Sequence, residues 1–175
     1  MHIMVDLETW GRKPGCALRS IGAVPFDPMR GVVGERTFYA NITRASCEEV
    51  GLTVDEETAA WWADQSADAQ RALLEDQRPL VAVLNDFTQW WSDVSGVEVW
   101  GHGAPFDPPI LEGAYAAVFM DAPWKFWDVR CCRTILALGN RRPDLRGSET
   151  KHNALHDAVA QARAVNATLK AGLKF

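Results

Sequence analysis

The sequence predicts an α/β fold in which α-helices flank a mixed central β-sheet. Apolar or alternating segments fill the first forty residues, amphipathic segments of helical spacing follow them, and a strand, a tight loop and a helix succeed one another from about residue 97. A period of two indicates strands, and apolar residues three and four positions apart indicate helices. This order is typical of a sheet whose faces are covered by helices.

Three strands are predicted in the first forty residues. They cover residues 2–7, 17–26 and 32–40, and turn-forming residues at 11–15 and 27–28 separate them. Because sequential strands with short connections pair in opposite directions, we expect an antiparallel meander.

A helical block is predicted after these strands. A capping pattern leads into residues 59–62, Ser66 opens a second helix over residues 66–74, and Pro79 suits the first turn of a third helix. The third helix keeps apolar residues at helical spacing, namely Leu80, Val83, Leu84, Phe87 and Trp91.

The second half of the chain begins with a βα unit. A strand over residues 97–100 precedes a helix over residues 104–119, whose Pro108 and Pro109 fit only the first turn of a helix. The later predicted elements are a strand at 125–129, a short helix at 134–138, a polar loop at 140–150 and an alanine-rich helix at 152–173. No linker or repeat interrupts this order, so we expect a single domain over residues 1–175.

Composition places the chain among globular proteins. Hydrophobic residues make up 47% of the 175 residues and charged residues 23%, which excludes a disordered chain. No apolar run approaches the roughly 18 residues that span a bilayer. The four cysteines lack CxxC spacing, so neither a zinc ribbon nor a disulfide framework is indicated. No basic region precedes the first apolar residues, so we expect no signal peptide and a cytoplasmic location.

The net charge of −5 is unevenly distributed. Residues 44–76 carry nine acids and two arginines, so we expect this segment to face water, away from phosphates. Residues 130–151 carry six basic residues and two acids, and we expect them to contact phosphates. The alternative is a solvated loop with incidental charge.

Two acids stand at the end of the first predicted strand. Asp6 and Glu8 are two positions apart, and alternation places them on the same side of the strand. Like charges this close repel unless a cation lies between them, so the pair indicates a metal site. A DxE triplet also occurs by chance, and a structural calcium site is the plainest alternative.

Two further acids and a histidine occur in other blocks of the sequence. Asp107 stands at the start of a predicted helix, where a carboxylate also stabilises the helix N-terminus. Asp157 follows His152 by five residues near the start of the last helix. Each of these residues alone fits a surface acid or a core histidine. Together, four acids and one histidine at strand ends and helix starts indicate one shared site.

At these positions the sequence resembles the DEDDh class of 3′–5′ exonucleases, the DnaQ-like branch of the ribonuclease H-like fold. The three motifs of that class are similar to VDLETWG, GAPFDPPIL and HNALHDAVAQA. A narrower resemblance, to phage and bacterial exonucleases that include DexA-type enzymes and RNase AS, rests on LTVDEETAAWWADQSADAQRALL, VWGHGAPFDPPIL and PWKFWDVRCCRTI. His102 and Cys131 depart from the residues usual in that family.

The resemblance implies hydrolysis of single-stranded RNA or DNA from the 3′ end to 5′-mononucleotides, with two Mg²⁺ or Mn²⁺ ions as cofactors. By analogy with the class, Asp6 would bridge both ions, and Glu8 and Asp157 would complete the site of the ion beside the attacking water. Asp107 would hold the second ion, and His152 would be the general base.

Alternatives remain for the base and for the function. His156 also lies near Asp157, but adjacent helix residues point about 100° apart, which favours His152. His102 is a lesser rival or a phosphate donor. A DNA proofreading subunit and a catalytically silent nucleic-acid-binding module are the alternative functions, and a silent module has no chemical reason to contain all five site residues.

Aromatic and basic residues are the candidates for holding the substrate, because single strands are commonly bound by base stacking and cationic contacts. We expect one of Trp61 and Trp62 to point inward, and the tryptophans after them to lie in the core or a subunit interface. The resemblance also implies a homodimer. The expected substrate-binding residues are Leu7 and Thr9 through backbone groups, Trp10, Trp61, Phe106, Arg141, Arg142 and Arg146.

Overall fold

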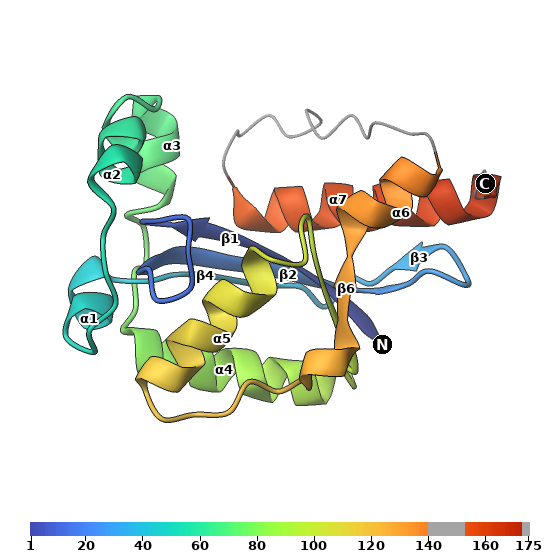
Figure 1. Ribbon diagram of the computed structural model, residues 1–175, viewed down its shortest axis with the longest axis horizontal. Coiled ribbons are helices and arrows are strands. Elements are labelled where there is room, and N and C mark those ends of the chain that lie inside the picture. Colours follow the sequence, from blue (N-terminus) through green and yellow to red (C-terminus); the bar gives the residue numbers. More distant parts are fainter. Residues whose placement is uncertain (140–152, 173–175) are drawn as a thin grey trace.

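A mixed six-stranded β-sheet forms the middle layer of the molecule (Figure 1). The computed structural model describes residues 1–139 and 153–172. The strands are β1 (His2–Thr9), β2 (Leu18–Asp27), β3 (Val32–Val33), β4 (Phe38–Asn41), β5 (Glu98–Gly101) and β6 (Val129–Cys131). Their order is β3-β2-β1-β5-β6, and β4 also pairs with β2.

The central strand β1 joins an antiparallel half of the sheet to a parallel half. β2 runs antiparallel to β1, β3 and β4, which confirms the predicted meander. β5 runs parallel to β1 and β6 runs parallel to β5. Because neighbouring parallel strands end at the same edge of a sheet, the segments that follow β1 and β5 begin side by side.

The prediction of one continuous strand over residues 32–40 is wrong. Residues 34–37 separate β3 from β4. On β2, the residues that pair with β3 and those that pair with β4 are separated only by Val24 and Pro25, so the two sides of the ladder do not match. Pro25 has no N–H to donate to the ladder, and its carbonyl accepts the N–H of Gly34 at 2.8 Å. The chain therefore leaves the sheet after β3 and returns to it at β4.

Helices cover both faces of the sheet, with α4 and α5 on one face and α6 and α7 on the other, while α1, α2 and α3 lie beside the ends of the strands (Figure 1). Their bounds are α1 (Arg44–Glu48), α2 (Glu56–Ala63), α3 (Ala67–Ala72), α4 (Leu80–Asp93), α5 (Asp107–Ala117), the 3₁₀ helix η1 (Phe126–Asp128), α6 (Cys132–Leu138) and α7 (Ala154–Ala171). The α/β class predicted from the sequence is confirmed.

Local capping explains where several helices begin. Asp55 accepts the N–H of Thr58 at 2.8 Å before α2, and Ser66 accepts the N–H of Ala69 at 3.3 Å before α3. Pro79 precedes α4, and all five apolar residues predicted on its inner face are buried. Helix α1 is only five residues long and was not expected from the sequence.

The predicted strand over residues 125–129 is wrong. Asp128 accepts the N–H of Lys125 at 3.2 Å and closes the turn η1, so β6 begins only at Val129. α6 begins at Cys132, two residues before its predicted start. The predicted polar loop at 140–150 lies outside the described residues.

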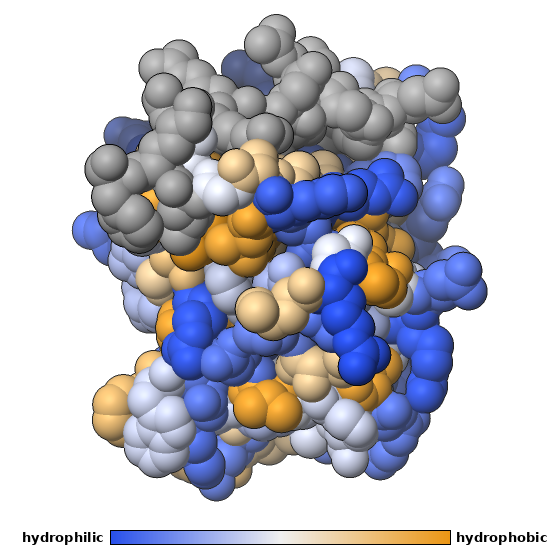
Figure 2. Space-filling model, turned by 90° about the vertical axis from the view of Figure 1, so that its right-hand side faces the viewer, coloured by the Kyte–Doolittle hydropathy of each residue, from blue (hydrophilic) through white to orange (hydrophobic). Residues whose placement is uncertain are grey.

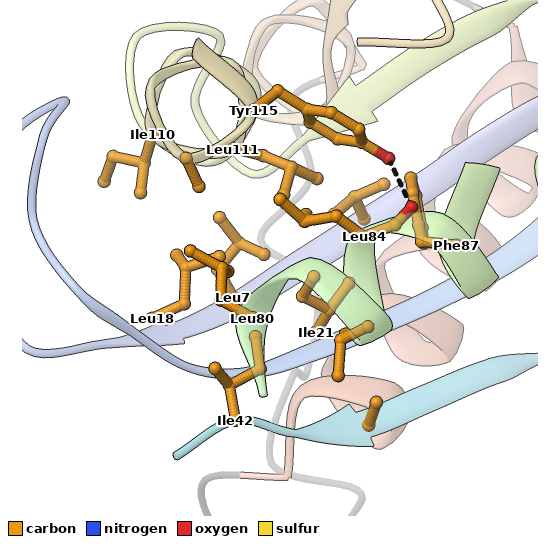
Figure 3. Packing of buried hydrophobic residues seen from close by; sticks show 14 of the residues in the cluster. Leu7, Leu18, Ile21, Ile42, Leu80, Leu84, Phe87, Ile110, Leu111 and Tyr115 are labelled. Carbon is orange, nitrogen blue, oxygen red and sulfur yellow. Dashed lines mark hydrogen bonds between the residues drawn. The ribbon is translucent and has the colours of Figure 1, made fainter. Parts of the chain in front are cut away.

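The larger apolar core lies between the sheet and helices α4 and α5 (Figure 3). Leu7 and Ile21 of the sheet and Leu84 and Phe87 of α4 belong to this core. Tyr115 of α5 donates its hydroxyl to the carbonyl oxygen of Leu84 at 3.1 Å. The two helices are thereby joined to each other as well as to the sheet.

A second core joins the opposite face of the sheet to α7. Met4 of β1 belongs to this core, whereas Val5 and Leu7 belong to the larger one. Because side chains alternate along a strand, Asp6 and Glu8 share the α7 face with Met4.

Gly22 of β2 allows α7 to approach the sheet closely. A Cβ atom at this position would lie 2.1 Å from backbone atoms of both Ala154 and Leu155. Gly22 pairs with Asp6 across the β1–β2 ladder. The glycine therefore lets the first turn of α7, which carries Asp157, lie beside the end of β1.

The surface mixes hydrophilic side chains with separate apolar patches on the face shown in Figure 2. The large exposed apolar side chains include Phe119, Phe126 and Trp127. The four cysteines are free, as the sequence predicts. Within residues 1–139 and 153–172, no helix has the length and apolar character needed to span a membrane.

We expect Gly22→Ala to lower the free energy of unfolding by about 1–3 kcal/mol or more, because the added methyl group would overlap the α7 backbone. Chemical denaturation of the variant and the unchanged protein measures this difference. An unchanged unfolding midpoint would mean that α7 can move away from β2 without cost.

Candidate active site

Three carboxylates meet where β1 ends and α7 begins. Asp6 and Glu8 occupy alternate positions near the end of β1, and Asp157 lies in the first turn of α7. One oxygen from each residue lies within 4.8 Å of the other two. The structure thus brings together three of the four acids predicted to hold metal ions.

Asp107 approaches from the opposite side of β1, as the first residue of α5. Its Oδ1 accepts the N–H of Leu7 at 3.3 Å, and its Oδ2 accepts the N–H of His102 at 3.2 Å. The parallel pairing of β1 with β5 makes this arrangement possible, because the loop after β5 then starts next to β1. Asp107 is not part of the 4.8 Å group. Its carboxylate is nevertheless held at the backbone of Leu7, the residue that separates Asp6 from Glu8.

The burial of these acids raises their pKa values. Burial first, and then the charges of Asp107, Glu8 and Asp157, raise the pKa of Asp6 well above its usual value. Burial and the nearby Asp157 raise the pKa of Glu8 to about 8. Burial raises the pKa of Asp107 to about 7 although backbone N–H groups oppose this effect. Negative charge at this site is therefore unfavourable unless a cation offsets it.

The donor set suits a divalent cation. All of the clustered ligand atoms are carboxylate oxygens, which are hard donors of the kind that Mg²⁺ and Mn²⁺ prefer. The clustered acids are partly buried and lie close enough together to repel one another, and a bound cation would relieve that repulsion. The residues present therefore fit the metal ions that the sequence resemblance implies.

A buried cation, Arg19, lies on the Glu8 side of this cluster. Its guanidinium stacks on the rings of Trp10 and Trp62, at 4.2 and 4.3 Å from their centroids. Burial lowers the pKa of Arg19 to about 10, while the charge of Glu8 acts in the opposite direction. Trp62 in turn donates its indole N–H to the carbonyl of Thr9 at 2.8 Å. Arg19 and Trp62 therefore connect α2 to the end of β1.

The acids open into a cavity of about 640 Å³. Among the predicted substrate-binding residues, its wall contains Leu7, Thr9, Trp61 and Phe106. Trp10 does not line the cavity and packs on Arg19 instead.

One tryptophan of the adjacent pair points inward, as predicted. Trp62 is only 3% exposed, whereas Trp61 is 46% exposed. The rings meet edge to face at 4.9 Å between centroids. Trp61 therefore presents an accessible aromatic surface in the wall of the cavity, and Trp62 supports it from behind.

The sequence predicts that residues 44–76 face water, away from phosphates, whereas in the structure α2 of this segment lines the cavity into which the acids open. Glu57 and Thr58 line the cavity, and Glu57 pairs with Arg12 at 2.7 Å. The sequence held a signal for this placement: Glu57 precedes Trp61 by four residues, so the two share a helix face.

The basic segment is only partly described. Arg130 binds Glu98 at 2.5 Å and the carbonyl of Trp127 at 2.6 Å, so internal contacts occupy its guanidinium. Arg133 lies near Gly103, in the loop that precedes Asp107. Burial lowers the pKa of His102, and the charge of Arg133 lowers it further. His152, Arg141, Arg142 and Arg146 lie outside the described residues.

Gln161 is a site neighbour that the sequence analysis did not predict. Its Nε2 donates to Oδ1 of Asp6 at 2.7 Å. The signal was its position four residues after Asp157, which places both side chains on one face of α7.

The fold is shared with solved exonuclease structures. Exonuclease X in complex with 5′ overhanging duplex DNA is 13% identical, with a TM-score of 0.61 over 98% of this chain and 93% of that one. The nuclease domain of 3'hExo, a DEDDh family member bound to rAMP, is 12% identical, with a TM-score of 0.61 over 99% and 94%. E. coli exonuclease I with a dT13 oligonucleotide is 14% identical, with a TM-score of 0.64 over 93% and 39%. The architecture is therefore that of the DEDDh exonucleases, a class whose activity depends on divalent metal ions.

Residues 1–169 match the family model of the 3'-5' exoribonuclease Rv2179c-like domain, and the chain belongs to this family. It is a 3′–5′ exonuclease, a hydrolase that acts on nucleic acids. No individual curated protein matches the chain.

The pKa of Glu8 predicts how the stability of the metal-free protein depends on pH. Because folding raises this pKa from 4.5 to about 8, protonated Glu8 favours the folded state. This contribution is fully present below 4.5 and is lost as pH rises through 8. We therefore expect the melting temperature in chelator to fall across that range, and Glu8→Gln to flatten the fall.

Differential scanning fluorimetry at a series of pH values measures this effect. Glu35→Gln, which removes an exposed acid, is the control and should leave the slope unchanged. An equally steep fall in the Glu8→Gln variant would contradict the assignment.

Proposed function

We propose that the protein removes 5′-mononucleotides from the 3′ end of single-stranded RNA or DNA, using two Mg²⁺ or Mn²⁺ ions. The observation that carries this proposal is the group of Asp6, Glu8 and Asp157 oxygens within 4.8 Å, placed in a cavity with an accessible tryptophan. One domain over residues 1–175 would contain the whole site.

The four acids would be the protein ligands of the two metal ions. Asp6 would bridge both ions, with Glu8 and Asp157 on one ion and Asp107 on the other. Bound divalent ions neutralise the phosphodiester and make water acidic enough to attack it at neutral pH. Asp107, held by two backbone N–H groups, supplies a ligand of fixed orientation.

A histidine would take the proton of the attacking water. We propose His152, which directly precedes Asn153, the residue that caps α7 by accepting the N–H of His156 at 3.1 Å. A position just before the helix start lies at the same end of α7 as Asp157. The near-neutral pKa of an ordinary histidine suits a general base.

The terminal nucleotide would enter the cavity beside Trp61. Stacking of a base on this ring and contact with Phe106 would hold it there. Leu7 already donates its N–H to Asp107, and the carbonyl of Thr9 already accepts from Trp62. Contacts to the 3′ hydroxyl would therefore use the carbonyl of Leu7 and the N–H of Thr9.

The segment containing Arg141, Arg142 and Arg146 would guide the rest of the strand, since it leads directly into His152. A homodimer and a cytoplasmic location are proposals that rest on the sequence alone. Four of the eight tryptophans, Trp62, Trp91, Trp100 and Trp124, are buried within one chain, so these four need no subunit interface to explain them.

The choice between RNA and DNA is the first question for experiment. The family is named for exoribonuclease activity, while the similar folds were solved with duplex DNA, rAMP and a dT13 oligonucleotide. We propose RNA as the preferred substrate, with DNA as the alternative.

We expect chelator to abolish hydrolysis and Asp6→Asn to lower it by several orders of magnitude, because the bridging acid serves both ions. End-labelled RNA and DNA oligonucleotides, incubated with Mg²⁺, Mn²⁺ or chelator, report direction and sugar preference in one experiment. Full activity in excess chelator, or a ladder that shortens from the 5′ end, would contradict the proposal.

We expect His152→Ala to lower the turnover number about 10²–10⁴-fold, the usual contribution of a general base. His156→Ala is the matched control and should have a much smaller effect. Steady-state kinetics at saturating metal compare the two. The reverse ranking would identify His156 as the base.

A further inference from the structure

We propose that Gln161 is a positioning residue for Asp6, and that its side-chain amide fixes the carboxylate that both metal ions share. This inference rests on the proposed metal-dependent function and adds a residue that touches neither metal nor substrate. Its role would be to hold a ligand in place.

The contact is short, buried and rigidly placed. Gln161 is 2% exposed, and its Nε2 donates to Oδ1 of Asp6 at 2.7 Å. Gln161 lies one helical turn beyond Asp157, so a single face of α7 carries both residues toward β1. The close packing of α7 on Gly22 and on α6 leaves little room for this face to move.

The side-chain amide of Gln161 has an unfavourable environment, so its hydrogen bond to Asp6 needs an explanation beyond packing. Its Oε1 is buried and has no hydrogen-bond partner among the described residues. An unsatisfied buried polar atom destabilises the folded state. Its helix neighbours Ala158, Ala162 and Val165 are apolar, so an apolar side chain at position 161 would suit the second core better. The hydrogen bond to Asp6 is the interaction that an apolar side chain would lose.

A neutral donor is the suitable chemistry at this position. Asp6 already has the carboxyl groups of Glu8, Asp107 and Asp157 as neighbours. A fourth acid would add repulsion, and a lysine or arginine would compete with the metal ions for the carboxylate. A glutamine N–H stabilises the ionised carboxylate and restricts its rotation without adding charge.

The test compares Gln161→Met with the unchanged protein. Methionine keeps a long unbranched side chain but cannot donate a hydrogen bond. Calorimetric titration with Mn²⁺, without substrate, should show affinity about 10–100-fold weaker, the usual cost of losing an outer-shell partner. The Mn²⁺ concentration for half-maximal hydrolysis should rise by a similar factor.

Asn166→Leu is the matched control. Asn166 lies on the same helix, is buried, and also has a side-chain oxygen without a partner among the described residues, but its Nδ2 donates to the carbonyl of Val32. Its replacement should leave Mn²⁺ affinity unchanged. If Gln161→Met does not fold, Gln161→Asn, which keeps the amide but shortens its reach, should show the same loss of affinity.

A folded Gln161→Met or Gln161→Asn protein that binds Mn²⁺ like the unchanged protein would overturn this inference while leaving the exonuclease proposal intact. An unchanged protein that neither binds Mn²⁺ nor needs metal for hydrolysis would instead overturn the proposed function. An equal loss of affinity in Asn166→Leu would mean that α7 acts only through general packing.

Discussion

The repulsion among partly buried carboxylates at the end of β1 is the constraint on which the rest of the site depends. Asp6 and Glu8 share one face of the strand because their positions differ by two, and Asp157 is brought against them by α7. Burial and mutual repulsion raise the pKa values of Asp6 and Glu8. The folded chain thus holds a charge arrangement that is costly by itself and favourable with divalent cations.

The sheet topology explains how four acids from three distant segments come to lie around the end of β1. β1 is the only strand that pairs in both directions among the described residues, antiparallel with β2 and parallel with β5. The loop after β5, the parallel neighbour of β1, leads to Asp107 on one face of the sheet. Gly22 of β2, the antiparallel neighbour, allows α7 and its Asp157 to lie close on the other face. Each core fixes one of these helices, so packing on both faces determines the ligand geometry.

Features with a local cause could be predicted from the sequence, and those that depend on tertiary contacts could not. The α/β class, the meander and the α4 face follow from periodicity, and the side shared by Asp6 and Glu8 follows from strand alternation. The split of residues 32–40 depends on the partner Pro25, and the η1 turn depends on the Asp128 side chain. Glu57 lies four residues before Trp61 and Gln161 lies four residues after Asp157, so helical spacing indicates that each shares a helix face with a predicted site residue.

Arg19 shows why the site still needs metal although a cation is close by. Its guanidinium is held between Trp10 and Trp62, where its charge opposes only part of the effect that burial and Asp157 have on Glu8. An arginine placed among the acids would neutralise them permanently and occupy the position that a divalent ion needs. Stacked on Trp10 and Trp62, Arg19 instead supports the cavity wall. The guanidinium of Arg19 thus stabilises the wall of the cavity, while the repulsion among the clustered acids is left for a bound cation to offset.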